Sequence, residues 1–243
     1  MGIQHAASRT MAKLSRMNMS RRSFFSSATR QESITSTADR VDCQVDGQGI
    51  ARVTLNRPTK MNALDMPMFE AIADTAALLK SDGSIRAVIL SGSGRAFCTG
   101  LDMSSVLQNK PRQSVERLLE REPEKHSNLA QDVGYLWREL PVPVIACLHG
   151  MCYGGGMQIA LGADIRLATR DCKLSIMEAK WGLIPDMSAS VTLRELVRID
   201  VAKELTMTGR VILGTVRLCC GNVGISVWGI LYYCRVWCTR THS

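Results

Sequence analysis

Two glycine-containing segments carry the first sign of chemistry in this 243-residue chain. They read RAFCTGLD (residues 95–102) and HGMCYGGGMQ (residues 149–158), and an apolar run that predicts a buried strand precedes each. Backbone N–H groups at a helix start lack intrahelical acceptors, and glycine lets a ligand approach them closely. Two such groups aimed at one point form an oxyanion hole, which stabilises negative charge on a carbonyl oxygen. Alternatively, the glycines only allow close helix–sheet packing, and spacing alone favours neither interpretation.

Other chemistries that use glycine or cysteine fit the sequence poorly. The glycines form no G-x-x-x-x-G-K-[ST] phosphate loop, and no G-x-G-x-x-G follows the first strand. Of the nine cysteines, Cys219, Cys220, Cys234 and Cys238 gather near the end without giving two C-x2-C pairs. We therefore predict no metal site.

The elements around these segments predict an α/β fold. Residues 41–58 alternate apolar and polar side chains around a turn, as in a hairpin, and apolar spacing within residues 66–79 predicts a helix with one buried face. Further short strands are expected within residues 87–92, 141–150, 163–169 and 173–178, and a helix–turn–helix within 193–209. Residues 104–139 have a charged, helical composition interrupted by prolines. Strands separated by helical connections indicate a largely parallel sheet.

Several blocks of sequence, in order, resemble the crotonase superfamily, the enoyl-CoA hydratases and isomerases. These blocks are NRPTKMNALD, GRAFCTGLD, PVPVIACLHGMCYGGGMQIALGADIRLAT and KLSIMEAKWGLIPD, and the resemblance covers about residues 42–210. It implies a spiral of ββα units, assembly as a homotrimer or hexamer, and an acyl-CoA thioester substrate whose enolate an oxyanion hole stabilises. Coenzyme A then belongs to the substrate, so no separate cofactor is expected.

The resemblance assigns the oxyanion-hole donors to two backbone amides. One is the N–H of Leu101, which follows Gly100, and the other is the N–H of Gly155, which follows Gly154. Gly100 and Gly154, which precede these amides, would lie against the substrate. We therefore take Leu101 and Gly155 as catalytic donors and their preceding glycines as substrate-binding residues.

The expected acid–base residues depart from the hydratase pattern. Hydratases carry one glutamate two residues after the triple glycine, where this chain has Gln158, and another at the position of Glu178. A carboxamide cannot take up a proton as a carboxylate does, although it can hold a water or a substrate by hydrogen bonds. Asp186, eight residues after Glu178, is similar to the second carboxylate of dienoyl-CoA isomerases. Without the resemblance, both acids would read as solvated loop carboxylates.

Five other polar residues near these blocks have alternative interpretations. Lys60, Asn62 and Arg57 are candidates for the entrance used by coenzyme A, and equally for ordinary surface residues. His149 ends a strand in a tight turn, so a structural role is favoured over a role as a base. Asp102 precedes a predicted helix and reads as its N-cap.

The combined expectation is an enzyme that shifts the double bond of an enoyl- or dienoyl-CoA in fatty-acid metabolism. Glu178 would move the proton, and Asp186 would assist as a second acid or base. Hydration of a 2-enoyl-CoA is the runner-up, because Gln158 removes one hydratase carboxylate. A catalytically weak acyl-CoA-binding or scaffold homologue is the third alternative, because the sequence after TMTGR departs from the family.

The charge of the chain lies at its two ends. The net charge is +8, but residues 1–31 hold six basic residues and residues 211–243 hold three, with no acid in either segment. Residues 32–210, with 21 basic and 22 acidic residues, offer nucleic acid no basic surface. No apolar run reaches the length of a membrane span. We predict a mitochondrial transit peptide within residues 1–40, hence the mitochondrial matrix, an acyl-CoA-binding core at 41–210, and an atypical cysteine-rich tail at 211–243.

Overall fold

The alternating pattern at the start of the core forms a hairpin. In this computed structural model, which describes residues 32–35, 39–108, 111–121, 123–215 and 232–233, β2 (Val41–Val45) pairs with antiparallel β3 (Ile50–Leu55). Alternate side chains of both strands are buried, as the period of two requires. At the turn, the Asp46 carboxylate accepts the backbone N–H groups of Gln48 and Ile50 at 2.9 and 3.0 Å. The predicted hairpin is confirmed.

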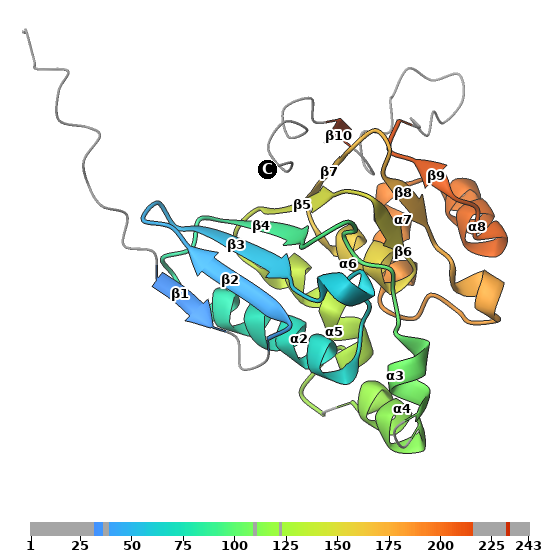
Figure 1. The fold of residues 1–243 in the computed structure, drawn as a ribbon, viewed down its shortest axis with the longest axis horizontal. Coiled ribbons are helices and arrows are strands. Elements are labelled where there is room, and N and C mark those ends of the chain that lie inside the picture. Colours follow the sequence, from blue (N-terminus) through green and yellow to red (C-terminus); the bar gives the residue numbers. More distant parts are fainter. Residues whose placement is uncertain (1–31, 36–38, 109–110, 122, 216–231, 234–243) are drawn as a thin grey trace, which may run out of the picture. The chain divides into compact units, whose positions relative to one another are not determined.

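Within the described residues, the strands form a seven-stranded sheet ordered β1-β2-β3-β4-β5-β7-β10 (Figure 1). β1 (Glu32–Thr35) is antiparallel to β2, whereas the strands from β3 onward pair in parallel. They are β4 (Ala87–Gly92), β5 (Val144–Leu148), β7 (Ile165–Ala168) and β10 (Tyr232–Tyr233). The predicted α/β fold with a largely parallel sheet is confirmed.

Two helices, α2 (Met66–Ser81) and α5 (Leu129–Tyr135), lie against one face of this sheet (Figure 1). The α2 helix starts at Asp65, whose side chain accepts the Met68 backbone N–H at 3.0 Å. Its buried face includes the predicted positions Phe69, Ile72, Ala76 and Leu79. Short helices adjoin these elements: η1 (Pro58–Lys60), α3 (Met103–Gln108), α4 (Pro111–Leu119) and η2 (Leu136–Glu139).

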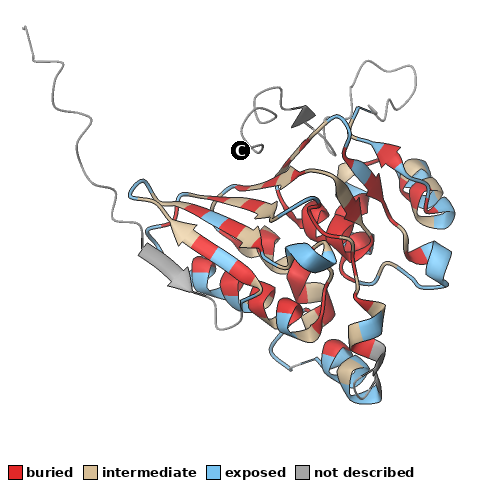
Figure 2. Ribbon diagram, in the orientation of Figure 1, coloured by how far each residue is buried: buried red, intermediate tan, exposed pale blue. Residues whose placement is uncertain are grey.

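A second, three-stranded sheet follows among the described residues, in the order β6-β8-β9. Its strands are β6 (Met151–Tyr153), β8 (Lys173–Ser175) and β9 (Ile212–Leu213), and the helices beside it are α6 (Gly155–Gly162), η3 (Glu178–Trp181), α7 (Ala189–Leu196) and α8 (Ile199–Thr208). All eight residues of α6 are buried, which suits a helix with no charged side chain (Figure 2). The strand expected at residues 173–178 ends earlier, because Met177 has helical backbone angles and Glu178 begins η3.

Both charged ends of the chain fall largely beyond the described residues. The predicted transit peptide lies outside them except for residues 32–35 and 39–40, and so do the four cysteines of the tail. Along the described ranges, no helix combines the length and apolarity needed to cross a bilayer.

Candidate active site

The two glycine segments run side by side and are joined by a single parallel bridge. Cys98 and Cys152 form an isolated parallel bridge, in which Cys98 N–H donates to Met151 O at 3.2 Å and Tyr153 N–H donates to Cys98 O at 3.0 Å. Two residues beyond the bridge, each segment reaches a glycine with positive φ, at +87° for Gly100 and at +52° for Gly154. The two turns therefore leave the bridge in register.

The amide that follows each turn has no acceptor in the described part of the chain. Leu64 N–H donates to Gly100 O at 2.8 Å and Asp102 N–H donates to Leu64 O at 2.9 Å, so the Leu101 N–H faces away from Leu64. Gly155 is the first residue of α6, where N–H groups have no intrahelical partner. No hydrogen bond from either amide to another described residue is present. A Cβ placed on Gly100 would lie 3.2 Å from the Gly155 nitrogen, so the two turns are in close contact.

The glycines have different structural reasons to be glycine. Gly100 needs its positive φ, and a Cβ there would lie 2.9 Å from Tyr153 O. At Gly156, by contrast, a Cβ would lie 2.3 Å from Cys98 O, so that glycine serves the packing of α6 against the bridged strand. The triple glycine thus combines a turn, an unpaired amide and a packing contact.

The two turns open onto a cavity of about 420 Å³. Its lining residues are Phe69, Thr99, Gly100, Leu101, Met103, Val106, Val115, Leu118, Leu119, Ala130, Gly154, Gly155, Gln158, Met177, Glu178, Trp181, Leu183, Ile184, Asp186 and Met187. Side chains from α2 to α5 make an apolar wall, and Gln158, Glu178 and Asp186 are the carboxylate and carboxamide side chains of the lining. An apolar cavity with a few convergent polar groups is typical of a small-molecule site.

Glu178 is the buried carboxylate of this cavity. It is 9% exposed, and its Oε1 accepts a 2.6 Å hydrogen bond from the Gln158 Nε2 group. Its Oε2 is buried and has no hydrogen-bond partner among the described residues. Burial raises the pKa of Glu178 and the charge of Asp186 adds to that shift, whereas the nearby backbone N–H of Glu178 itself and the Gln158 hydrogen bond oppose it. A carboxylate held this way accepts a proton more readily than a solvated one.

Gln158 and Asp186 both line the cavity with Glu178, but they differ in exposure. Gln158 is buried, and its Oε1 accepts the backbone N–H of Ala189, the first residue of α7, at 3.2 Å. Asp186 is exposed and contributes to the cavity lining. The structure therefore brings together Leu101, Gly155, Glu178, Gln158 and Asp186, with their roles in catalysis still predictions.

The structure does not bring Asn62 or Lys60 to the cavity. Asn62 is fully buried, accepts the Arg57 N–H at 2.8 Å, and donates to three carbonyl oxygens, those of Ser93, Ala96 and Phe97, at 2.9, 2.9 and 3.1 Å. This corrects the expectation of an entrance residue, because Asn62 is buried outside the cavity lining and both polar atoms of its side chain have partners. Lys60 is exposed and outside the cavity lining.

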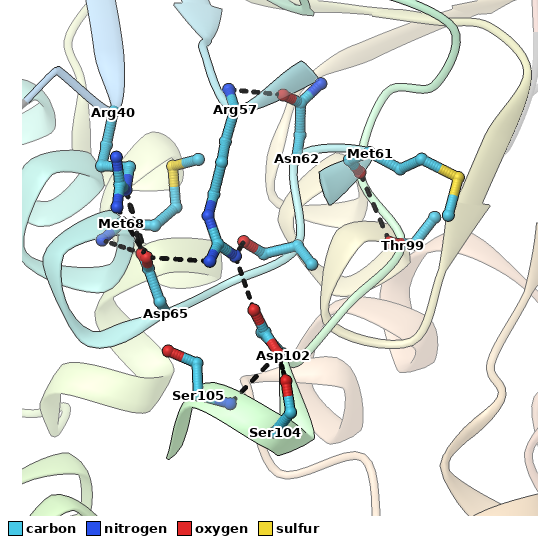
Figure 3. Close-up of polar contacts among 11 residues, drawn as sticks. Arg40, Arg57, Met61, Asn62, Asp65, Met68, Thr99, Asp102, Ser104 and Ser105 are labelled. Atoms are coloured by element: carbon cyan, nitrogen blue, oxygen red, sulfur yellow. Dashed lines mark hydrogen bonds and ion pairs between the residues drawn. The ribbon is translucent and has the colours of Figure 1, made fainter. Parts of the chain in front are cut away.

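Arg57 belongs to a polar network beside the first turn (Figure 3). Its guanidinium donates to Asp102 at 2.8 Å and lies 3.4 Å from Asp65, which also binds Arg40 at 3.0 Å. Asp102 accepts the Ser105 backbone N–H at 3.1 Å, which confirms the predicted N-cap. Burial opposes the ionisation of Asp102, but the hydrogen bonds from Ser104, Arg57 and Ser105 outweigh it and lower the pKa to about 2.

His149 has a structural contact, as expected. Its Nε2 lies 2.9 Å from the carbonyl oxygen of Gly94. A cluster of three or more His, Cys, Asp or Glu side chains placed to bind a metal is absent from the described residues. The acid–base candidates of the cavity are therefore Glu178 and Asp186.

Sequence reasoning missed two parts of the site. The hydrogen bond from Ala189 to Gln158 joins residues 31 positions apart, and no local pattern signals it. The apolar wall includes Phe69, Val106 and Leu118, of which only Phe69 lay on a predicted buried helix face. Helical periodicity identifies a buried face without telling a core position from a cavity wall.

Together these groups can stabilise an oxyanion and accept a proton from a neighbouring carbon. Two unpaired amides suit a carbonyl oxygen that gains negative charge. A buried carboxylate with an unoccupied oxygen suits a general base. Acid–base chemistry next to an activated carbonyl is what this arrangement can perform.

Comparison with known proteins gives one consistent result. A family model described as enoyl-CoA hydratase/isomerase matches residues 50–224. Enoyl-CoA hydratase EchA19 of Mycobacterium tuberculosis is 34% identical over 65% of this chain and 57% of its own length. The mitochondrial Delta(3,5)-Delta(2,4)-dienoyl-CoA isomerase of Rattus norvegicus is 31% identical over 66% of this chain and 50% of its own length.

A solved structure shows the same fold. The crystal structure of an enoyl-CoA hydratase from Mycobacterium smegmatis matches with a TM-score of 0.64 and 31% identity, over 72% of this chain and 65% of that one. The match spans 57% and 50% of the length of the two curated relatives described above.

Proposed function

This chain belongs to the enoyl-CoA hydratase/isomerase family, and on that premise we propose that it shifts the double bond of an enoyl- or dienoyl-CoA. One observation carries the proposal: Glu178 is the buried carboxylate of the cavity, and the residue that faces it is the carboxamide of Gln158 at 2.6 Å. One base beside two unpaired amides is sufficient to move a proton along an activated chain.

The proposed reaction gives the two amides and Glu178 separate tasks. The thioester oxygen accepts the N–H groups of Leu101 and Gly155, which stabilise the enolate by about 3–4 kcal/mol each. Glu178 removes a proton from the carbon next to the thioester carbonyl, and the electrons of that C–H bond form the enolate. When the carboxyl group returns the proton further along the chain, the double bond moves and Glu178 is again a carboxylate.

Hydration of a 2-enoyl-CoA is the second candidate, and Asp186 is the observation that favours it. Asp186 lines the cavity and its charge influences the pKa of Glu178, so two carboxylates are available to position and activate a water. Asp186 is nevertheless exposed, whereas Glu178 is buried. In the isomerase proposal, Asp186 assists as a second acid or base for conjugated substrates.

The test is an activity assay on three substrate classes: 2-enoyl-, 3-enoyl- and 3,5-dienoyl-CoA. We expect isomerisation, and we expect Glu178→Gln to lower its kcat/KM by about 10²–10⁴-fold. Glu120→Gln, an exposed residue outside the cavity lining, is the matched control and should keep the parent rate. Full isomerase activity in the Glu178 variant would refute the mechanism, and water addition without isomerisation would favour the hydratase.

Assembly and location complete the proposal. Exposed apolar side chains at the cavity mouth, among them Trp181 and Ile184, support association of copies as a trimer or hexamer. The basic, acid-free residues 1–31 support import into the mitochondrial matrix. Size-exclusion chromatography with light scattering tests the first point, and imaging of a fusion that carries residues 1–40 tests the second.

A further inference from the structure

We propose that Gln158 is a positioning residue that decides which oxygen of Glu178 carries the proton, by holding Oε1 and leaving Oε2 as the base. The inference rests on the proposed function, because it concerns the same carboxylate. It adds a task for a residue that cannot itself exchange protons. The argument starts from the orientation of the carboxamide.

A backbone amide fixes how the Gln158 side chain is turned. The Ala189 N–H can only donate, so the atom that faces it at 3.2 Å must be the carbonyl oxygen of the carboxamide. The NH₂ group is then on the other side, 2.6 Å from Glu178 Oε1. Because Gln158 is only 1% exposed, solvent offers little compensation for the reversed orientation.

This orientation makes the two oxygens of Glu178 unequal. A proton on Oε1 would point at the NH₂ group of Gln158, so two donors would face each other. Oε1 is therefore kept as an acceptor, and an incoming proton goes to Oε2. Oε2 is buried and without a hydrogen-bond partner in the described part of the chain, so its lone pairs are unoccupied. The carboxylate thus offers one held oxygen and one reactive oxygen.

Charged groups around Glu178 leave this asymmetry in place. The α6 helix, which carries Gln158, has no charged residue. The α8 helix packs against η3 and carries Asp200, Lys203 and Glu204, and Lys180 lies on η3 itself. Among these groups and Asp186, only Asp186 contributes to the pKa shift of Glu178. The polar contact specific to one oxygen is that of Gln158.

Two substitutions separate positioning from a merely structural link between α6 and α7. Gln158→Glu keeps an acceptor for the Ala189 N–H but replaces the donor to Glu178 with a second carboxylate. Two carboxylates at this distance share one proton, so one of their pKa values rises strongly. The acidic limb of the pH profile of isomerase kcat/KM should therefore move to higher pH by about one unit or more.

Gln158→Met removes both hydrogen bonds while keeping a side chain of similar length. The loss of a donor to the ionised carboxylate should raise the acidic limb in the same direction and lower kcat by about 10-fold or more. In a Glu178→Gln background, Gln158→Met should have no further effect on the residual rate, because both changes act on the same group. Thermal unfolding of each variant shows which of them fold.

The outcomes distinguish this inference from the proposed function. If Glu178→Gln retains isomerase activity, the proposed function is wrong. If Glu178→Gln is inactive while Gln158→Glu keeps the parent pH profile, the positioning role is wrong, and Gln158 only ties α6 to α7. The Gln158→Glu comparison suffices even if Gln158→Met fails to fold.

Discussion

Two polar clusters lie beside the glycine turns, and they differ in how completely their hydrogen-bonding groups are occupied. In the network of Arg40, Arg57, Asp65 and Asp102, every carboxylate oxygen has a partner. In the cavity, Glu178 Oε2 and the two amides have none among the described residues. The pKa of Asp102 accordingly falls to about 2, whereas burial raises the pKa of Glu178. Occupied groups hold the fold, and unoccupied groups remain free for a substrate.

The network also positions the site that it adjoins. Asp102 directly follows Leu101 and caps α3, and its second oxygen binds Arg57. Asp65 caps α2 and binds the other side of the same guanidinium. The segment that carries the first amide is therefore held between two helix starts by one arginine.

The largest expected effect is a loss of activity when the turn that presents the Leu101 amide is disturbed. Gly100→Ala would place a Cβ 2.9 Å from Tyr153 O and 3.2 Å from the Gly155 nitrogen, at a φ of +87° that alanine avoids. Loss of one oxyanion donor should lower isomerase kcat by about 10²–10³-fold. The measurement is steady-state kinetics on the folded fraction. Leu101→Ala, which keeps the backbone amide, is the control for loss of side-chain packing, and equal losses in both variants would contradict the donor role.

The next effect concerns stability. Asp65→Asn keeps a side chain that can cap α2 but leaves Arg40 without its partner, so the free energy of unfolding should fall by about 2–3 kcal/mol. Asp65→Ala should lose about 1 kcal/mol more, because the cap is also lost. Urea unfolding measures both. A fall in the kcat of the folded protein would show that the network affects the reaction as well as stability.

A smaller loss of stability is expected at Asn62. Asn62→Ala leaves three carbonyl oxygens without their donor and puts alanine at a φ of +55°, which together should destabilise the fold by about 2 kcal/mol. Asn62→Gly loses the same hydrogen bonds without the backbone penalty. Equal unfolding free energies for the two variants would show that backbone strain contributes nothing.

The smallest expected effect is a gain, not a loss, in thermal stability. Glu178→Gln should raise thermal stability at pH 8, because the raised pKa means that the folded state disfavours the ionised carboxylate. As the pH falls below the folded pKa, the parent also carries a neutral side chain, so the difference should shrink. Differential scanning calorimetry between pH 4 and pH 8 measures it. A gain that stays constant with pH would show that ionisation is not its cause.

The features that could be predicted from sequence are local ones. The hairpin and α2 follow from periods of two and 3.6 residues, and the Asp102 cap follows from a short polar side chain before a helix. The location of the donor amides came from motif resemblance. Asn62 was misassigned because its acceptors lie 31 to 35 positions later, in the loop that follows β4. Gln158 likewise bonds to both Glu178 and the backbone N–H of Ala189, and the latter lies 31 positions away.

The bridge between Cys98 and Cys152 helps to set the positions of the two unpaired amides, those of Leu101 and Gly155. Neighbouring strands lie about 4.8 Å apart, and an N–H donor sits about 2.9 Å from its acceptor. The bridge sets that spacing at Cys98 and Cys152, and two residues later the turns bring the segments so close that a Cβ on Gly100 would lie 3.2 Å from the Gly155 nitrogen. The backbone of the two bridged segments thus places the unpaired amides, and one residue inserted between Cys98 and Gly100, or between Cys152 and Gly154, would shift one turn relative to the other.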